Sequence, residues 1–296
     1  LDTIRHPEEE QAEMLRWHIE SVVRGGLAGT IVYAWTDEWF RGGQEILDWS
    51  FGLVRRDRSK KPAFDTVKQL FSGDGPMTSR VKLPSYPKAS VIVCSYNGAK
   101  TLDRCLTSLK DIHYPDYEVI LVDDGSTDET PEIAARHSWV RTIRQENKGL
   151  SFARNVGAHA STGEVIVYTD SDCMADPDWL YYLIGTLLSG NFAGVGGPNI
   201  SPPAENWVQA CVSAAPGGPS HVLLTDVVAE HIPGCNMAFH RWAFDQVGGF
   251  DHEYRKAGDD VDFCWRLQQS GGVIAFSPAA IVWHYRRFTL KAFRKQ

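Results

Sequence analysis

The sequence predicts an α/β protein built on a doubly wound, mostly parallel sheet, and three observations predict it. Between residues 89 and 172, short runs rich in Val and Ile alternate with stretches whose apolar residues recur at helical spacing. The apolar runs end directly in loops rich in Asp, Ser and Gly, as strands do at the carboxyl edge of such a sheet. The composition, 43% hydrophobic and 23% charged, is that of a globular protein.

The first 75 residues predict a smaller unit of helix, strand and helix. Proline and glutamates in the first turn, followed by an apolar face, favour a helix at 7–23. A strand is expected at 29–35, with Asp37 in an exposed loop at its exit, and a second helix at 62–71. One strand is too little for an independent sheet. We therefore expect residues 1–75 to dock on the second domain or on another chain.

The other predicted elements follow a linker. Residues 76–88 are rich in Gly, Pro and Ser, which places a domain boundary there and a second domain at 89–296. In that domain we expect strands at 89–95, 117–122, 140–143 and 164–170, and helices at 102–109, from 130, within 147–157 and from 259 to a stop at Gly271. The carboxyl ends of parallel strands gather along one edge, which is therefore the candidate active site.

Two carboxylates stand where one of these buried strands ends. Asp170 and Asp172 are two residues apart, so in extended backbone both can face one ligand. Oxygen ligands of this kind suit Mg²⁺ or Mn²⁺ shared with phosphate groups. An Asp-rich turn is the alternative for this motif taken alone. A calcium loop is disfavoured because the expected Gly and Glu at later positions are missing.

Polar residues also follow other predicted strands. A carboxylate such as Asp123 or Asp124 can accept from a ribose hydroxyl or a base imide, while the next residue, Gly125, lets the backbone approach the ligand. Lys148 and Arg154 can bind a diphosphate. The alternative for the two aspartates is an ordinary Asp-Gly turn. The alternative for Lys148 and Arg154 is a solvated helix face. The sequence contains no P-loop motif.

Two further candidates lie toward the end of the chain. Asp259 and Asp260 open a predicted helix, where they either cap it or face the cleft. His284 follows a short predicted strand and is either packed or a metal ligand.

Seven motifs stand in order along the chain: Ser90–Asn97, Val122–Asp128, Gly149–Asn155, Asp170–Asp172, Gly234–Phe239, Val247–Asp251 and Gly258–Phe263. Together they resemble the family-2 glycosyltransferases of GT-A fold over about residues 88 to 290. The resemblance implies an inverting transfer of a sugar from a nucleotide sugar, usually a UDP-sugar, with Mn²⁺ or Mg²⁺. It also implies a glycan or lipid-linked acceptor and a role in polysaccharide or cell-envelope biosynthesis.

The resemblance assigns roles by position. Asp172 would bind the metal, and His284 would complete that site as in several relatives. Asp260 would act as the base that deprotonates the acceptor hydroxyl. The family usually has Glu where this chain has Asp259, which leaves the role of that shorter side chain open. The donor would contact Cys94, Ser95, Tyr96, Asn97, Asp123, Asp124, Lys148, Arg154, Asp170 and Ser171, and the acceptor Gly234, Cys235 and Asn236.

Two other functions stay open. One is a noncatalytic scaffold that binds a nucleotide or a glycan. The other is a sugar nucleotidyltransferase, although its usual Gly-rich signature is absent after the first strand of the second domain. The Gln-x-x-Arg-Trp motif of polysaccharide-extruding members is also missing, which argues against a processive synthase.

The N-terminal unit carries a second resemblance. Ala34–Trp39 and Asp48–Asp57 are similar to the last quarter of a (β/α)₈-barrel glycoside hydrolase. Glycoside hydrolysis needs two carboxylates at a fixed separation, which one strand end cannot supply. We therefore expect residues 1–75 to be a barrel fragment without hydrolase activity.

Composition excludes several other classes. The net charge of −7 argues against a nonspecific nucleic-acid binder, and no apolar run is long enough for a transmembrane helix. Six cysteines without a C-x-x-C pair indicate reduced thiols in a cytoplasmic protein rather than a disulfide framework or a zinc site. Both ends are expected to be cut from a longer polypeptide, whose membrane association stays open.

Overall fold

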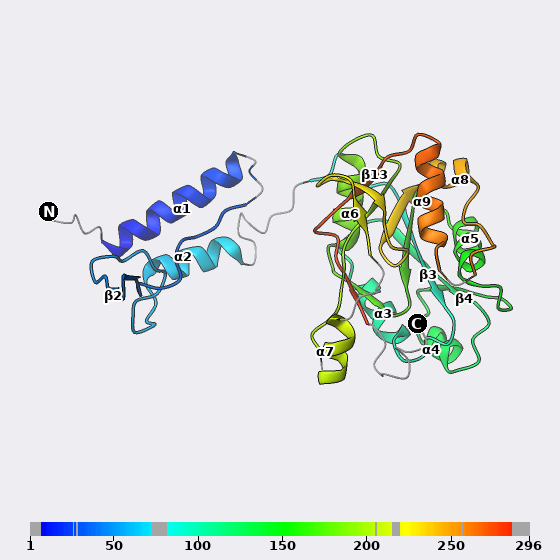
Figure 1. Ribbon diagram of the computed structural model, residues 1–296, viewed down its shortest axis with the longest axis horizontal. Helices are drawn as coiled ribbons and strands as arrows, with labels where there is room; N and C mark the ends of the chain where they lie inside the picture. The colour runs from blue at the N-terminus through cyan, green and yellow to red at the C-terminus, as the bar shows by residue number, and fades with distance from the viewer. Residues whose placement is uncertain are drawn as a thin grey trace. The chain divides into compact units, whose positions relative to one another are not determined.

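The computed structural model describes residues 7–25, 27, 29–72, 82–204, 206–214, 220–255 and 257–285 (Figure 1). The chain divides into two compact units, Leu1–Lys82 and Leu83–Gln296. Within the described residues, none of the helices combines the length and the apolar character that a bilayer span requires.

In the first unit, two helices pack against each other. These are α1 (Glu8–Arg24) and α2 (Pro62–Phe71), and the chain between them forms a short hairpin of β1 (Phe40–Arg41) and β2 (Gln44–Glu45). The buried core of this unit is small: Ala12, Leu53 and Ala63 form one cluster, and Ile19, Val54 and Leu70 are also buried.

The strand expected at 29–35 is wrong. This stretch is extended and lies beside residues 51–54, with Leu53 N donating to Ala34 O at 3.0 Å and Val54 N donating to Trp35 O at 3.0 Å. Its ladder is reduced to one parallel bridge between Thr36 and Val54. A strand needs neighbours to complete its hydrogen bonds, and the described part of this unit offers this extended stretch only one.

Asp37 does not lie in an exposed loop, so that expectation is also wrong. Asp37 and Lys61 are only 4% and 2% exposed, and Lys61 Nζ lies 2.8 Å from the Asp37 carboxylate. Gly52 N donates to the same carboxylate at 2.8 Å, and Lys61 Nζ also donates to Ser50 O at 3.0 Å. Burial of these charges is tolerated because each is paired and hydrogen-bonded.

The second unit is built on the large sheet that the sequence predicts. Its nine strands, in spatial order, are β10 (Val222–Leu223), β11 (Val228–His231), β13 (Ile274–Phe276), β8 (Gly194–Gly196), β12 (Met237–His240), β6 (Val165–Asp170), β3 (Ala89–Ser95), β4 (Tyr117–Asp123) and β5 (Arg141–Arg144). All but β11 and β12 run in one direction, so the mostly parallel α/β fold is confirmed. A smaller sheet has the order β7 (Cys173–Ala175), β14 (Val282–His284) and β9 (Asn199–Ile200).

Helices cover both faces of the large sheet (Figure 1). Alternate residues of a strand point to opposite faces, so Val91 and Val93 pack with one set of helices and Ile92 with the other. The first set is α3 (Leu102–Lys110), α4 (Thr130–Arg136) and α6 (Trp179–Leu188), and the second is α5 (Leu150–Ala160), α8 (Arg241–Val247) and α9 (Asp259–Gln269). A further helix, α7 (Trp207–Ala214), lies outside both core clusters.

Candidate active site

Three neighbouring strands bring their polar carboxyl ends together. Ser95 at the end of β3 is paired with Asp123 at the end of β4, and Cys94 is paired with Asp170 at the end of β6. The register therefore places these residues along one short stretch of the sheet edge. This confirms that the predicted strand ends meet at one edge.

A cavity of about 360 Å³ opens beside these strand ends. Its walls include Cys94 of β3 and residues of four loops, namely Tyr96 after β3, Asp124 after β4, Asn147 before α5 and Arg255 before α9. Tyr96 is more than half exposed at 55%. An aromatic ring beside a carboxylate suits a ligand that has both a planar base and hydroxyl groups.

Asp124 is buried and organises the loop before α5. Its carboxylate accepts hydrogen bonds from Gln145 Nε2 at 2.7 Å, Lys148 N at 2.9 Å and Gly149 N at 2.9 Å. Gly149 has φ +99°, a conformation that favours glycine. The helix expected within 147–157 begins only at Leu150, because the residues before it are held by Asp124.

The loops after β3 and β4 are joined to each other. Asn97 N donates to Ser126 Oγ at 2.9 Å, and Thr127 N donates to Asn97 Oδ1 at 2.8 Å. Asp123 Oδ1 accepts from Ser126 N at 2.9 Å, so this carboxylate closes its own turn. The side chains of Asn97 and Asp123 thus hold these loops, and neither residue is among those that line the cavity.

Arg154 of α5 lies between two carboxylates. Its Nη1 donates to Asp259 Oδ2 at the start of α9, and its Nη2 lies 3.7 Å from Asp170 Oδ1. The Arg154 and Asp259 side chains are 3% and 2% exposed. Burial alone would lower the pKa of Arg154, but the charges of Asp259 and Asp170 raise it above its usual range. Burial raises the pKa of Asp170 to about 6, against the opposing effect of Arg154.

Asp260 is oriented by backbone groups. Gly234 N donates to Asp260 Oδ2 at 2.8 Å, and Val261 N donates to Asp260 Oδ1 at 3.0 Å. A Cβ at Gly234 would overlap the Arg154 guanidinium, so only glycine allows this approach. The residue that caps α9 is Gly258, and the helix has no side-chain cap, so Asp259 faces Arg154 instead of capping.

Asp172 and His284 form the other end of the site. His284 Nε2 lies 3.4 Å from Asp172 Oδ1, and the Asp172 side chain is 43% exposed. Burial by itself lowers the pKa of His284, but the hydrogen bond and charge of Asp172 raise it to about 9. This environment attracts a positive charge. A carboxylate oxygen beside an imidazole with a buried, unpaired Nδ1 fits a divalent metal such as Mn²⁺.

Several expected contact residues lie elsewhere or point away. The ammonium group of Lys148 lies over the Phe152 ring, 4.6 Å from its centroid, and the residue is exposed. Asn236 is fully buried, and its side chain bonds Pro198 O, Ala280 O and the Trp179 indole. Cys235 is also buried. The direct acceptor contacts expected for the Asn236 and Cys235 side chains do not fit this burial.

Two polar residues of the cavity wall, and a third residue that supports the wall, escaped the sequence analysis. Asn147 and Arg255 line the cavity, and Gln145 bonds Asp124. The signal for Arg255 was its basic side chain just before the glycine that caps α9. No pattern in the sequence marks Gln145, since its role depends on contact with Asp124, which lies 21 positions away. Asn147 is likewise marked by no pattern, since only the fold brings it to the cavity wall. Arg286 and Arg287, which follow His284 in the sequence and are further candidates to clamp the diphosphate, fall outside the described residues.

Comparisons with known proteins agree on one family. The sequence profile of glycosyl transferase family 2 matches residues 90–248. The pre-mycofactocin glycosyltransferase of Mycobacterium tuberculosis is 30% identical over 216 residues, which are 70% of this chain and 45% of the relative. Glycosyltransferase AglE of Haloferax volcanii is 34% identical over 71% of each chain. The chain thus spans less than half of the mycobacterial relative.

Solved structures share the fold. A mannosyltransferase of Pyrobaculum calidifontis, in complex with GDP-Man and Mn²⁺, superposes with a TM-score of 0.56 at 22% identity, covering 74% of this chain and 64% of that one. TarS 1–349 of S. aureus, in complex with UDP-GlcNAc, gives 0.54 at 20% identity, covering 70% of this chain and 60% of that one. These likenesses establish a GT-A-like α/β fold.

Proposed function

This chain belongs to glycosyl transferase family 2, and we propose that it transfers a sugar, with inversion, from a nucleotide sugar to a hydroxyl group. The donor is proposed to be a UDP-sugar and the acceptor a glycan or a lipid-linked glycan of the cell envelope. The observation that carries the proposal is the position of Arg154 between Asp170 and Asp259, which joins the edge of the sheet to the start of α9.

The donor is proposed to lie along the ends of β3, β4 and β6. Its base would enter the cavity beside Tyr96, and its ribose would lie near Asp124. The hydrogen bonds that Asp124 already accepts from the 145–149 loop hold this wall in place before a ligand arrives. Such preorganisation reduces the loss of conformational entropy that binding must offset.

Asp260 is proposed as the base. The acceptor hydroxyl gives its proton to the Asp260 carboxylate while its oxygen forms a bond to the anomeric carbon of the sugar. The bond from that carbon to the diphosphate oxygen breaks, and the electron pair leaves with the nucleoside diphosphate. One displacement of this kind inverts the configuration at the anomeric carbon.

Asp172 and His284 are proposed to hold the divalent metal. When bound, it supplies positive charge to the leaving diphosphate. Asp170 lies close to both Asp172 and Arg154, so the same edge of the sheet carries carboxylates for the metal and a buried cation behind them. Asp259 is proposed to position Arg154 rather than to touch the substrate, which gives the shorter side chain at this position a role.

The N-terminal unit and the location of the protein are separate proposals. Residues 1–75 are proposed to derive from a glycoside-hydrolase barrel and to dock on the transferase unit or on a second chain. The six free thiols support a reducing, cytoplasmic compartment.

The function is tested by calorimetric titration of UDP with and without Mn²⁺. We expect Mn²⁺-dependent binding to the wild type and its loss in Asp172→Ala. The matched control is Asp116→Ala, because Asp116 is an exposed carboxylate that immediately precedes β4, at the opposite edge of the sheet. Release of UDP from a panel of UDP-sugars then identifies the donor.

Two results would count against the proposal. If UDP does not bind the wild type under either condition, the assignment of the nucleotide is wrong. If UDP binds but no nucleotide is released from any sugar donor with glycan acceptors present, the chain is a binding scaffold and the assignment of Asp260 as base fails.

A further inference from the structure

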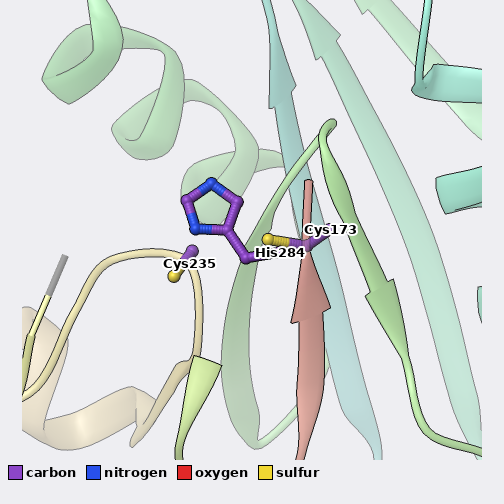
Figure 2. Close-up of side chains that lie close together, drawn as sticks. All are labelled: Cys173, Cys235 and His284. Atoms are coloured by element: carbon purple, nitrogen blue, oxygen red, sulfur yellow. The ribbon is translucent and has the colours of Figure 1, made fainter. Parts of the chain in front are cut away.

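A second cluster of ligand-type side chains lies beside the candidate active site (Figure 2). Cys173 begins β7 and His284 ends β14, and the antiparallel register pairs them directly. Cys235 lies in a turn that is closed by a hydrogen bond of 2.9 Å from Asn236 N to Pro233 O. One ligand atom from each of Cys173, Cys235 and His284 lies within 4.8 Å of the other two.

The cluster is buried and incompletely paired. Cys173 and Cys235 are 1% and 2% exposed, and Nδ1 of His284 is buried without a hydrogen-bond partner. An unpaired buried nitrogen destabilises a protein, because it has lost its contact with water. Coordination of this nitrogen to a cation in the cluster would remove the penalty, and so would a small rotation of the ring that brings the nitrogen to the cation. The unpaired nitrogen therefore points to a ligand independently of the two thiols.

We propose that Cys173, Cys235 and His284 bind one divalent cation of the zinc type. Two thiolates and an imidazole are preferred ligands of Zn²⁺, whereas Mg²⁺ and Mn²⁺ prefer oxygen. Asp172 Oδ1 lies 4.0 Å from Cys173 Sγ and 3.4 Å from His284 Nε2, so this carboxylate can be the fourth ligand only of a cation bound at Nε2. Coordination at the unpaired Nδ1 leaves the fourth position to water. Zn²⁺ binds two thiolates and a neutral imidazole, so both thiol protons and the second proton of any imidazolium at His284 are released to solvent on binding.

The ligands come from three separate parts of the chain. The lack of a C-x-x-C pair argued against a zinc site in the sequence, but spacing along the chain does not constrain residues that the fold brings together. Short pairing between β7 and β14 sets two of the ligands opposite each other, and the turn before β12 adds the third. The site is therefore a product of tertiary structure.

The zinc-type site shares His284 and Asp172 with the proposed donor site. Two divalent cations that share one imidazole repel each other, so Zn²⁺ in the cluster opposes the binding of Mn²⁺ at its proposed ligands. We expect Zn²⁺ to weaken Mn²⁺-dependent binding of UDP. This consequence rests on the proposed function, whereas the zinc-type site itself does not.

The site is tested with Co²⁺, a coloured substitute for Zn²⁺, on reduced, metal-free protein without nucleotide. We expect a sulfur-to-cobalt charge-transfer absorption that saturates at one Co²⁺ per chain and disappears when Zn²⁺ is added. Cys173→Ser and Cys235→Ser should each lose most of this absorption. Cys211→Ser is the matched control and should keep it, because Cys211 is the exposed cysteine outside the cluster.

A measurement on the wild type keeps the test valid if a variant does not fold. X-ray absorption of the zinc-loaded protein should show sulfur neighbours at about 2.3 Å. A shell of oxygen and nitrogen alone, or a charge-transfer band that survives both serine substitutions, would overturn the proposal. Failure of UDP to bind would leave these cobalt and zinc results unchanged, so the two proposals fail separately.

Discussion

The guanidinium of Arg154 donates to the carboxylate of Asp259, and both side chains are buried although 105 positions separate them in sequence. The contact joins α5 to the first turn of α9 through one charged hydrogen bond. It also brings Asp260, the next residue, to the backbone of Gly234. The position of the proposed base therefore depends on a pair that is not itself proposed to react.

Removal of the Arg154 charge should destabilise the transferase unit strongly. In Arg154→Met, Asp259 keeps a buried carboxylate without its cation, and Asp170 keeps a partly buried one. Breaking one side of a buried pair costs about 3–5 kcal/mol. The free energy of unfolding, measured with denaturant, should fall by that order.

The control for Arg154 lies on α9. Asp262→Asn breaks the pair between Arg266 Nη2 and Asp262 Oδ2, which are 2.7 Å apart and partly exposed. Such pairs contribute about 1 kcal/mol or less, so the loss should be small. Arg154→Met combined with Asp259→Leu should be less destabilising than the sum of the two single changes, because no partner of that pair is left charged. Strict additivity would contradict the coupling.

Asp260→Asn should separate catalysis from binding. Asparagine retains an oxygen that can accept from Gly234 N, so stability should change little. It cannot take the acceptor proton, and the loss of a general base lowers the rate about 10²–10⁴-fold. Single-turnover transfer and UDP affinity should be measured together, with Asp262→Asn as the control two residues further along α9. A rate within a few-fold of the wild type would exclude Asp260 as the base.

The strands of the parallel half of the sheet could be predicted because their signal is local. A run such as Val91–Val93 alternates between two core layers whatever its neighbours are. The order of the strands could not be predicted, since β12 reaches its place between β6 and β8 by non-local pairing. The strand expected at 29–35 failed for the same reason, because its sequence pattern does not supply the partner strands that it needs.

The candidate site also contains residues that local sequence patterns predict and residues whose role depends on non-local contacts. Asp170 and Asp124 were found because they directly follow apolar runs, and the sheet brings such ends together. The two alternatives for Asp259 could be decided only by its contact with Arg154. Asn236 belongs to a recognisable motif, yet its side chain holds three partners in the core, which no spacing along the chain reveals.

One cysteine should react quickly with a thiol reagent, and the other five should react slowly. Cys211 is exposed, and the other five cysteines are buried. Burial raises the pKa of Cys264 to about 12 and raises the pKa of Cys173 well above its usual value, which reduces the reactive thiolate near neutral pH. Reaction with a disulfide reagent at pH 8 should therefore show one fast thiol per chain. Cys211→Ser should remove the fast phase, and a second fast thiol in the wild type would contradict the burial.

The buried ion pair of the N-terminal unit should matter more than an exposed one beside it. Lys61→Met leaves the Asp37 carboxylate buried without its cation and should cost about 3–5 kcal/mol of stability. Arg58→Met breaks the neighbouring pair with Glu38, whose side chains are 54% and 38% exposed, and should cost about 1 kcal/mol or less. Thermal unfolding of the full chain should be measured for both variants, and the loss of stability in the transition of residues 1–82 should be compared between them. Equal losses would show that burial does not decide the contribution here.

The transferase unit should fold without the N-terminal unit if the cut respects its core. Among the described residues, the two core clusters of the second unit contain no residue before Leu83, and the cluster of the first unit contains none after Ala63. A chain of residues 83–296 should therefore unfold cooperatively and bind UDP as the full chain does.

A chain of residues 89–296, cut at the boundary that composition suggests, loses Leu83 from the core and the contact of Tyr86 with Tyr114. Burial of one leucine contributes about 1.5–3 kcal/mol, so this shorter chain should be less stable by at least that order. Aggregation of the 83–296 chain, or equal stability of the two chains, would contradict the division, and calorimetric unfolding distinguishes these outcomes.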